Sequence, residues 1–233
     1  MRKSFIMAPP STQFIEHFNL YPKAALSQWL EVRRALHDTG ANVMIADGEA
    51  DTGRLGVFWK QERHFKDNIG DLLKLVAPVS YEQIVFDKDA NILWYGFTCD
   101  EEFQHKKILD SIFDGTDITV RALPIELKDQ YPTLSHCMNV LPNGTLIWVP
   151  ECFSEYTRGI LESFYSRNIC IGGQDALNYV CGCISVGNTV ISGPMSTTLK
   201  THLSLSQDII EVDVREWLAK RLTLKSLANE IIQ

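Results

Sequence analysis

Residues 131–165, YPTLSHCMNVLPNGTLIWVPECFSEYTRGILESFY, contain the most regular pattern in the chain. Two short apolar runs, Cys137–Leu141 and Thr145–Val149, flank Pro142-Asn143-Gly144, and a turn of this composition predicts a β-hairpin. Apolar residues four positions apart then predict a helix, namely Ile160 with Phe164 and Leu161 with Tyr165. A further apolar run at 168–171 predicts a closing strand. The stretch and the residues just after it therefore predict one β-β-α-β unit.

The same plan recurs on both sides of this stretch. Two more hairpins are predicted, one joining Ile84–Phe86 to Asn91–Tyr95 and one joining Cys183–Val186 to Thr189–Ile191. Helical spacing follows each of them, at 108–113 and more weakly at 195–205, and closing strands are predicted at Ile118–Leu123 and Asp208–Val214. A unit that recurs at roughly 45–55 residues indicates a repeat architecture.

The N-terminal half contains further elements of the same kind. A strand at Phe5–Met7 precedes a helical apolar stripe and a second strand at Asn42–Ala46; the stripe consists of Ala25, Trp29, Val32 and Leu36. Arg54–Lys60 then precedes another predicted helix, around Glu62–Val76. A chain of 233 residues holds about five units of about 47 residues, which favours a closed ring of α/β modules in one domain, residues 1–233. Hairpins inside the units disfavour the alternative, a doubly wound open sheet.

Composition limits the partners. The net charge of −7 argues against nucleic acid, which needs a basic face, and no apolar run is long enough to cross a membrane. The N-terminus has too short an apolar stretch for a signal peptide. The six cysteines are therefore expected to be reduced thiols of a cytoplasmic protein.

Several short motifs resemble one family. Phe5-Ile6-Met7-Ala8-Pro9-Pro10 is similar to a strand that ends in Met-Cys-Pro-Pro, and Leu93–Gly96 to a leucine-tryptophan-x-glycine strand. The other matching segments are Thr133–Met138, Val149–Phe153, Gln174–Cys181 and Lys225–Ala228. Together they resemble the pentein superfamily of guanidino-group-modifying enzymes, in its amidinotransferase and dimethylargininase-like branch. The resemblance is strong over residues 131–233, moderate over 5–45 and poor between about 47 and 90. It implies a fivefold pseudo-symmetric α/β propeller of ββαβ modules.

The resemblance also implies where catalysis would occur. Such enzymes attack the guanidinium carbon with a cysteine thiolate, while a histidine moves protons and carboxylates hold the planar cation. The cysteine position falls at Ser226, the histidine position at Thr133, and an acid position at Ser135. A serine hydroxyl is far less ionised than a thiol, and threonine does not shuttle protons near neutral pH. Three roles are thus lost together.

Substitutes are few. His136 is the nearest histidine, but the predicted strand would place its side chain on the face opposite Thr133 unless a bulge rotated it; otherwise it is a half-buried structural residue. The family's guanidinium-binding acids fall at Val79 and Gln83, which leaves Glu82 and Asp51 as weak candidates that are equally plausible as surface carboxylates. Cys181 and Cys183, placed on one face of a strand, have no second pair with zinc-ligand spacing, so core packing is the expectation. No metal and no cofactor is expected.

The sequence therefore predicts a catalytically degenerate pentein that binds a small guanidino ligand or a protein partner. The alternative is an active hydrolase or amidinotransferase on an arginine-like substrate, with Ser226 or a relocated cysteine as nucleophile and His136 as base. A structural subunit of a larger assembly is a third possibility, and oligomerisation is compatible with all three.

Overall fold

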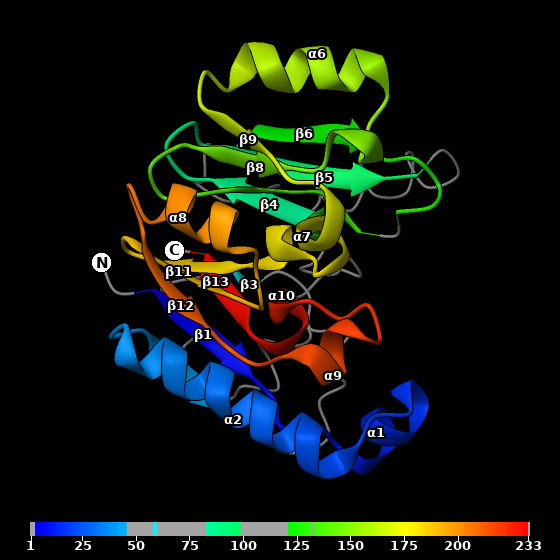
Figure 1. Cartoon of the computed structure of the whole chain (residues 1–233), viewed down its shortest axis with the longest axis vertical. Coiled ribbons are helices and arrows are strands. Elements are labelled where there is room, and N and C mark those ends of the chain that lie inside the picture. Colours follow the sequence, from blue (N-terminus) through cyan, green and yellow to red (C-terminus); the bar gives the residue numbers. More distant parts are fainter. Residues whose placement is uncertain (1–2, 46–57, 60–82, 99–120, 132, 233) are drawn as a thin grey trace.

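The structure, a computed structural model, describes residues 3–45, 58–59, 83–98, 121–131 and 133–232. The described residues form four small β-sheets with helices on their outer faces (Figure 1). The strands are β1 (Ser4–Met7), β2 (Asn42–Ile45), β3 (Phe58–Trp59), β4 (Ile84–Asp87), β5 (Ile92–Phe97), β6 (Arg121–Glu126), β7 (Met138–Val140), β8 (Leu146–Trp148), β9 (Asn168–Cys170), β10 (Ile184–Val186), β11 (Thr189–Ser192), β12 (Asp208–Glu211) and β13 (Asn229–Ile232).

The helices are mostly short. They are α1 (Thr12–Phe18), α2 (Pro22–Asp38), α5 (Leu134–Cys137), α6 (Glu155–Phe164), α7 (Gly173–Leu177), α8 (Thr197–Leu203), α9 (Arg215–Leu218) and α10 (Leu224–Leu227), with 3-10 turns η3 (Pro150–Cys152) and η4 (Val180–Gly182). Serine side chains cap three of them: Ser11, Ser154 and Ser196 accept backbone N–H groups at the starts of α1, α6 and α8.

Three sheets have the same strand plan, and it is the predicted one. In each, an antiparallel hairpin is followed by a third strand that lies parallel to the hairpin's second strand: β4-β5-β6, β7-β8-β9 and β10-β11-β12. All three predicted hairpins are confirmed. The helices predicted after the second and third hairpins are α6 and α8. The helices predicted at 108–113 and 62–76 lie outside the described residues.

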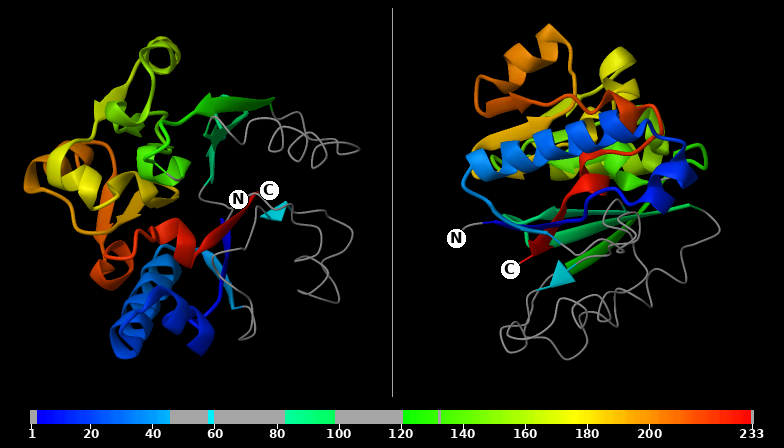
Figure 2. Two further views of the ribbon diagram at one scale, coloured as in Figure 1. Left: turned by 90° about the vertical axis from the view of Figure 1, so that its right-hand side faces the viewer. Right: turned by 90° about the horizontal axis from the view of Figure 1, so that it is seen from below.

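The fourth sheet uses both ends of the described chain. Strand β13 pairs antiparallel with β1, β1 pairs parallel with β2, and α1 and α2 connect β1 to β2. This is the same ββαβ plan, with its hairpin-like pair formed by segments more than 220 residues apart in sequence. The two ends of the chain consequently lie side by side, as Figure 2 shows. Strand β3 adds to the other side of β13.

Two apolar clusters stabilise this arrangement. One joins the β4-β5-β6 and β7-β8-β9 sheets to α6 and includes the buried Trp94 and Trp148; the other lies between α2, α9 and α10 and includes Trp29 and Trp217. These four tryptophans are buried in the core. A buried polar chain crosses the first cluster, since the Trp94 Nε1–H donates to the Tyr165 hydroxyl, which donates to the Asp87 carboxylate, each over 2.7 Å.

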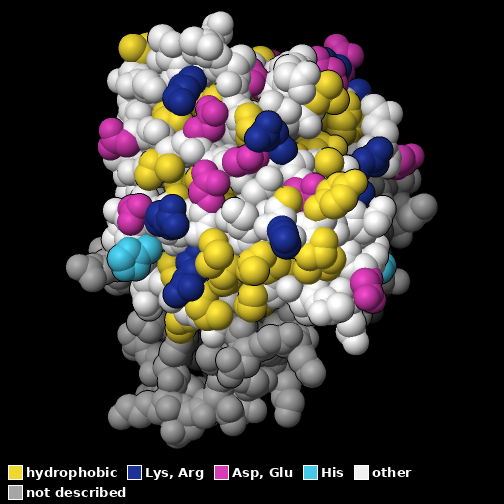
Figure 3. Space-filling model, turned by 60° about the horizontal axis from the view of Figure 1, so that its bottom comes forward, with side chains coloured by type: hydrophobic (Ala, Val, Ile, Leu, Met, Phe, Trp, Pro, Cys, Tyr) yellow, Lys and Arg dark blue, Asp and Glu magenta, His cyan; other side chains and the backbone are white. Residues whose placement is uncertain are grey.

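Helix α2 packs its apolar stripe inward and leaves some apolar side chains outside. Ala25, Trp29, Val32 and Leu36 are buried, whereas Leu26 and Leu30 are exposed. Figure 3 shows that face of the molecule, where apolar and basic side chains lie among one another. None of the helices formed by the described residues is long and apolar enough to cross a membrane.

Candidate functional site

The segment predicted to hold the family's histidine position is a helical turn, which corrects the prediction of a strand. Thr133 has extended backbone dihedral angles and precedes α5, and β7 starts only at Met138. In a helical turn, residues three apart share a face. Thr133 and His136 therefore lie together, whereas a strand would have placed them on opposite faces. His136 is also more buried than expected, at 5% exposed.

A hydrogen-bonded network connects these side chains. The Thr133 Oγ1 lies 2.7 Å from His136 Nδ1 and 3.2 Å from Ser135 Oγ. The His136 Nε2 lies 3.0 Å from the carbonyl oxygen of Arg221. Because a carbonyl oxygen only accepts, Nε2 carries a proton, and when the ring is neutral Nδ1 accepts the Thr133 hydroxyl proton. Both ring nitrogens are thus engaged.

Two residues with left-handed backbones hold the imidazole in place. Arg221, which supplies the accepting carbonyl, has φ of 60°, and Tyr179, whose ring centroid lies 4.3 Å from that of His136, has φ of 49°. Such dihedral angles are uncommon for residues other than glycine and persist where the surroundings fix them. His136 is therefore a fixed part of the packing between α5, η4 and the segment before α10.

Ser226, which the resemblance predicts to stand at the family's cysteine position, closes the first turn of α10. Its hydroxyl oxygen accepts the backbone N–H of Thr223 over 3.0 Å, and the Thr223 side chain in turn accepts the Ser226 N–H, which makes a reciprocal capping box. Ser226 is 4% exposed. The usual capping-box signature has Glu or Gln where this chain has Ser226, so the sequence motif alone did not predict this cap.

Gly182 makes room for the capping box. A Cβ at Gly182 would lie 2.5 Å from the Thr223 Cβ and 2.7 Å from its Cγ2, closer than side-chain atoms approach each other. Glycine at this position lets η4 pack directly on the first residue of the cap. The same requirement holds at Gly96 of the leucine-tryptophan-x-glycine motif, where a Cβ would lie 2.9 Å from the Leu134 Cβ.

The candidate guanidinium-binding acids Glu82 and Asp51 lie outside the described residues, as does Val79. Gln83 is described and directly precedes β4. The structure therefore describes the surroundings of four predicted site residues: Thr133, Ser135, His136 and Ser226.

The described cysteines are free thiols, and four of the five are buried. Cys181 belongs to η4 and Cys183 directly precedes β10, so the two do not share one face of a strand as predicted. Burial raises the pKa of the Cys137, Cys181 and Cys183 thiols and disfavours their thiolates. Within the described part of the chain, no group of three or more His, Cys, Asp and Glu side chains could hold a metal ion.

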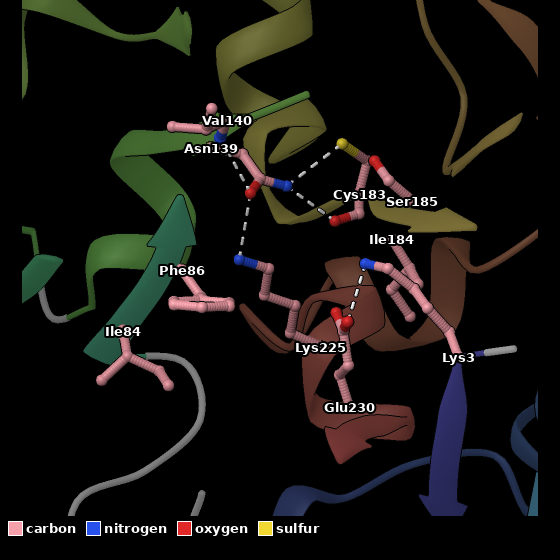
Figure 4. A pocket seen from close by; sticks show the side chains of 10 residues that line it. All are labelled: Lys3, Ile84, Phe86, Asn139, Val140, Cys183, Ile184, Ser185, Lys225 and Glu230. Carbon is pink, nitrogen blue, oxygen red and sulfur yellow. Dashed lines mark hydrogen bonds and ion pairs between the residues drawn. The ribbon is translucent and has the colours of Figure 1, made fainter. Parts of the chain in front are cut away.

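Lys225, the neighbour of Ser226, was not singled out from the sequence. It is 4% exposed, and its Nζ lies 3.4 Å from the Asn139 Oδ1. Burial lowers its pKa from 10.5 to about 8. Its side chain lines a pocket with a cavity volume of about 40 Å³, to which four sheets contribute (Figure 4). Lysines are rarely fully buried, so the sequence offered no signal for this one.

Known proteins similar to this chain act on arginine. The bifunctional arginine dihydrolase/ornithine cyclodeaminase AgrE of Nostoc sp. is 27% identical over 149 residues, which cover 60% of this chain and 21% of that protein. Its counterpart ArgZ of Synechocystis sp. is 24% identical over 172 residues, covering 69% and 24%. The matches thus span about a quarter or less of the curated relatives. No family model matches the chain.

Solved structures match the whole chain. The N-terminal domain of ArgZ, an arginine dihydrolase from the ornithine-ammonia cycle in cyanobacteria, superposes with a TM-score of 0.78 at 20% identity, covering 100% of this chain and 98% of that one. DDAH from Pseudomonas aeruginosa, in a mutant complexed with citrulline, gives a TM-score of 0.74 at 14% identity, covering 99% and 100%. The chain therefore has the fold of the pentein superfamily of guanidino-group-modifying enzymes. In sequence, the chain is similar to part of AgrE and part of ArgZ.

Proposed function

We propose that this protein is a catalytically degenerate pentein that binds a small guanidino ligand, or a protein partner, without guanidine chemistry. The observation that carries the proposal is the hydrogen bonding of Ser226. Its hydroxyl accepts the Thr223 N–H inside a buried capping box. A serine nucleophile instead needs an adjacent base to take its proton during attack.

The surroundings of His136 support the same proposal. A general base must have a lone pair directed at the proton that it removes. The Nε2 of His136 donates to the Arg221 carbonyl, and Nδ1 accepts from Thr133, so accepting a substrate proton would require one of these bonds to break. Cys137, Cys181 and Cys183 are disfavoured as relocated nucleophiles, because burial raises the pKa of their thiols.

Retained binding is compatible with a serine at the cysteine position. The N-terminal domain of ArgZ has been solved as a cysteine-to-serine mutant bound to substrate. A pentein without that thiol can therefore hold its ligand, and the loss of chemistry does not imply the loss of binding. The finer features of the fold are part of this proposal: a single domain, a fivefold propeller extending the four observed units, and a reduced cytoplasmic protein with free thiols.

The alternative function is an active arginine-type hydrolase or amidinotransferase, and the 27% identity to AgrE favours it. Calorimetric titration with L-arginine, combined with assays for citrulline, ornithine, urea and ammonia, separates the two. We expect saturable binding of at least one compound among arginine, methylated arginines and agmatine, with no product. Product formation above a protein-free control would overturn the proposal.

A further inference from the structure

The pocket around Lys225 lies where all four sheets meet. Its polar side chains come from the segment before β1 (Lys3), β7 (Asn139), β10 (Ser185), α10 (Lys225) and β13 (Glu230). Its apolar side is formed by β4, β7 and β10; the residues are Ile84, Phe86, Val140 and Ile184. Figure 4 shows these side chains converging on one space. Thr133, Ser135, His136 and Ser226 do not line it, so this pocket is separate from the family's catalytic positions.

The charged lining groups leave the pocket positive. Lys3 and Glu230 form an ion pair over 2.7 Å, and their formal charges cancel. Lys225 adds one positive charge, so the sum over the lining residues is +1 − 1 + 1 = +1. The neighbouring thiols Cys181 and Cys183 contribute no negative charge near neutral pH, because burial raises their pKa. A buried positive charge is costly, and an anion beside it reduces that cost.

Hydrogen-bond donors lie beside this charge. The Asn139 side chain is already used, since its Nδ2 donates to the Cys183 carbonyl and its Oδ1 lies near Lys225. The Ser185 hydroxyl is buried and, among the described residues, has no hydrogen-bond partner. Buried polar atoms are normally satisfied, so a hydroxyl of this kind indicates a missing partner. An oxyanion that accepts from Ser185 and Lys225 would supply it.

Size selects the ligand. Each water-sized sphere needs about 10–15 Å³ of cavity, so about 40 Å³ holds roughly three to four non-hydrogen atoms. Acetate has four non-hydrogen atoms, whereas phosphate has five. The apolar side formed by Ile84 and Phe86 suits a short aliphatic substituent. We propose that this pocket binds a small carboxylate of about the size of acetate, with its oxygens on Lys225 and Ser185 and its carbon substituent against Phe86.

The test is a calorimetric titration with sodium acetate against sodium chloride at equal ionic strength, using the wild type and three variants. We expect saturable acetate binding, weakened at least tenfold in Lys225→Met and severalfold in Ser185→Ala. The matched control Lys23→Met removes an exposed lysine from α2 and should leave the affinity unchanged. Because the pKa of Lys225 is about 8, the wild-type affinity should fall roughly tenfold between pH 7 and pH 9.

Several outcomes would overturn the proposal. The first is that acetate shows no saturable binding at concentrations up to about 0.1 M, on the order of the weakest useful affinity. The second is that the wild type and Lys225→Met bind acetate equally well. The third is that phosphate binds more tightly than acetate. Circular dichroism of each variant checks that it is folded, and Ser185→Ala provides a second route should Lys225→Met fail to fold. L-arginine titrated into the same Lys225→Met protein reports the proposed guanidino site separately, so the two proposals can fail independently.

Discussion

Lys225 and Ser226 are neighbours in the short helix α10, yet their side chains serve different regions of the molecule. The Ser226 hydroxyl closes a capping box with Thr223, an arrangement that stabilises the helix and in which the Ser226 oxygen accepts a backbone N–H. The Lys225 ammonium reaches Asn139 in a pocket between four sheets, where burial disfavours its charge. The comparison teaches that the Ser226 side chain stabilises the start of α10, while the side chain of the adjacent Lys225 carries a buried charge.

The largest expected effect concerns that charge. Burial lowers the pKa of Lys225 from 10.5 to about 8, so between these pH values the unfolded chain binds more protons than the folded one. Stability contributed by this residue therefore rises with pH in that window. The free energy of unfolding of wild type relative to Lys225→Met should increase by about 2–3 kcal/mol between pH 7 and pH 10. Urea denaturation of both proteins at each pH measures this difference. The other titrating groups are present in both proteins, so their contributions cancel in the difference.

If the difference in unfolding free energy between the wild type and Lys225→Met did not change with pH, Lys225 would not be buried as a cation. The contrast drawn between Lys225 and Ser226 would then be wrong for Lys225. Lys23→Met is the control, since Lys23 is exposed on α2 and its removal should leave the pH profile of the wild type unchanged.

The next effect tests the stabilising role of the capping box, through Gly182, which packs against Thr223. Gly182→Ala would bring a methyl group within 2.5 Å of the Thr223 Cβ and should destabilise the protein by about 2 kcal/mol. Gly159→Ala is a matched control in α6, where a Cβ meets nothing within 4 Å and should stabilise the helix by up to about 1 kcal/mol. Thermal and urea denaturation measure both. Equal stability of the two variants would contradict the packing described for η4 on α10.

A smaller effect is expected at Thr133. Thr133→Val removes the hydroxyl that donates to His136 Nδ1 and should lower the free energy of unfolding by about 1 kcal/mol, whereas Thr133→Ser should retain the bond and the stability. Nitrogen-15 NMR of the His136 ring gives a second readout, because the Nε2–H tautomer bonded to Arg221 should persist in the serine variant. An unchanged ring spectrum in Thr133→Val would sink the proposed network.

Local chemistry made much of the fold predictable. Pro142-Asn143-Gly144 fixes a hairpin through residues that tolerate its turn, and Gly144 does adopt a positive φ of 75°. Likewise, the apolar pairs four residues apart predicted a helix, and the structure has α6 there. The pairing of β13 with β1 was not predictable from a local pattern, because its partners lie at opposite ends of the described chain.

The candidate site was less predictable. Thr133–Cys137 was taken as a strand because a helical turn of only four residues is too short to show a helical period. That error placed His136 on the wrong face. The assignment of Ser226 to the family's cysteine position stays a prediction, and its capping role depends on Thr223 as its partner. The burial of Lys225 depends on four converging sheets, which no short window of sequence encodes.

The central claim is that Ser226 caps a helix and does not attack a guanidinium carbon. The most direct measurement compares product release from L-arginine by wild type and Ser226→Ala, assayed as citrulline, ornithine, urea and ammonia. Both proteins are predicted to give the rate of a protein-free control, although Ser226→Ala should be about 1 kcal/mol less stable from the lost cap. Turnover by the wild type that disappears in Ser226→Ala would contradict the claim and identify Ser226 as a working nucleophile.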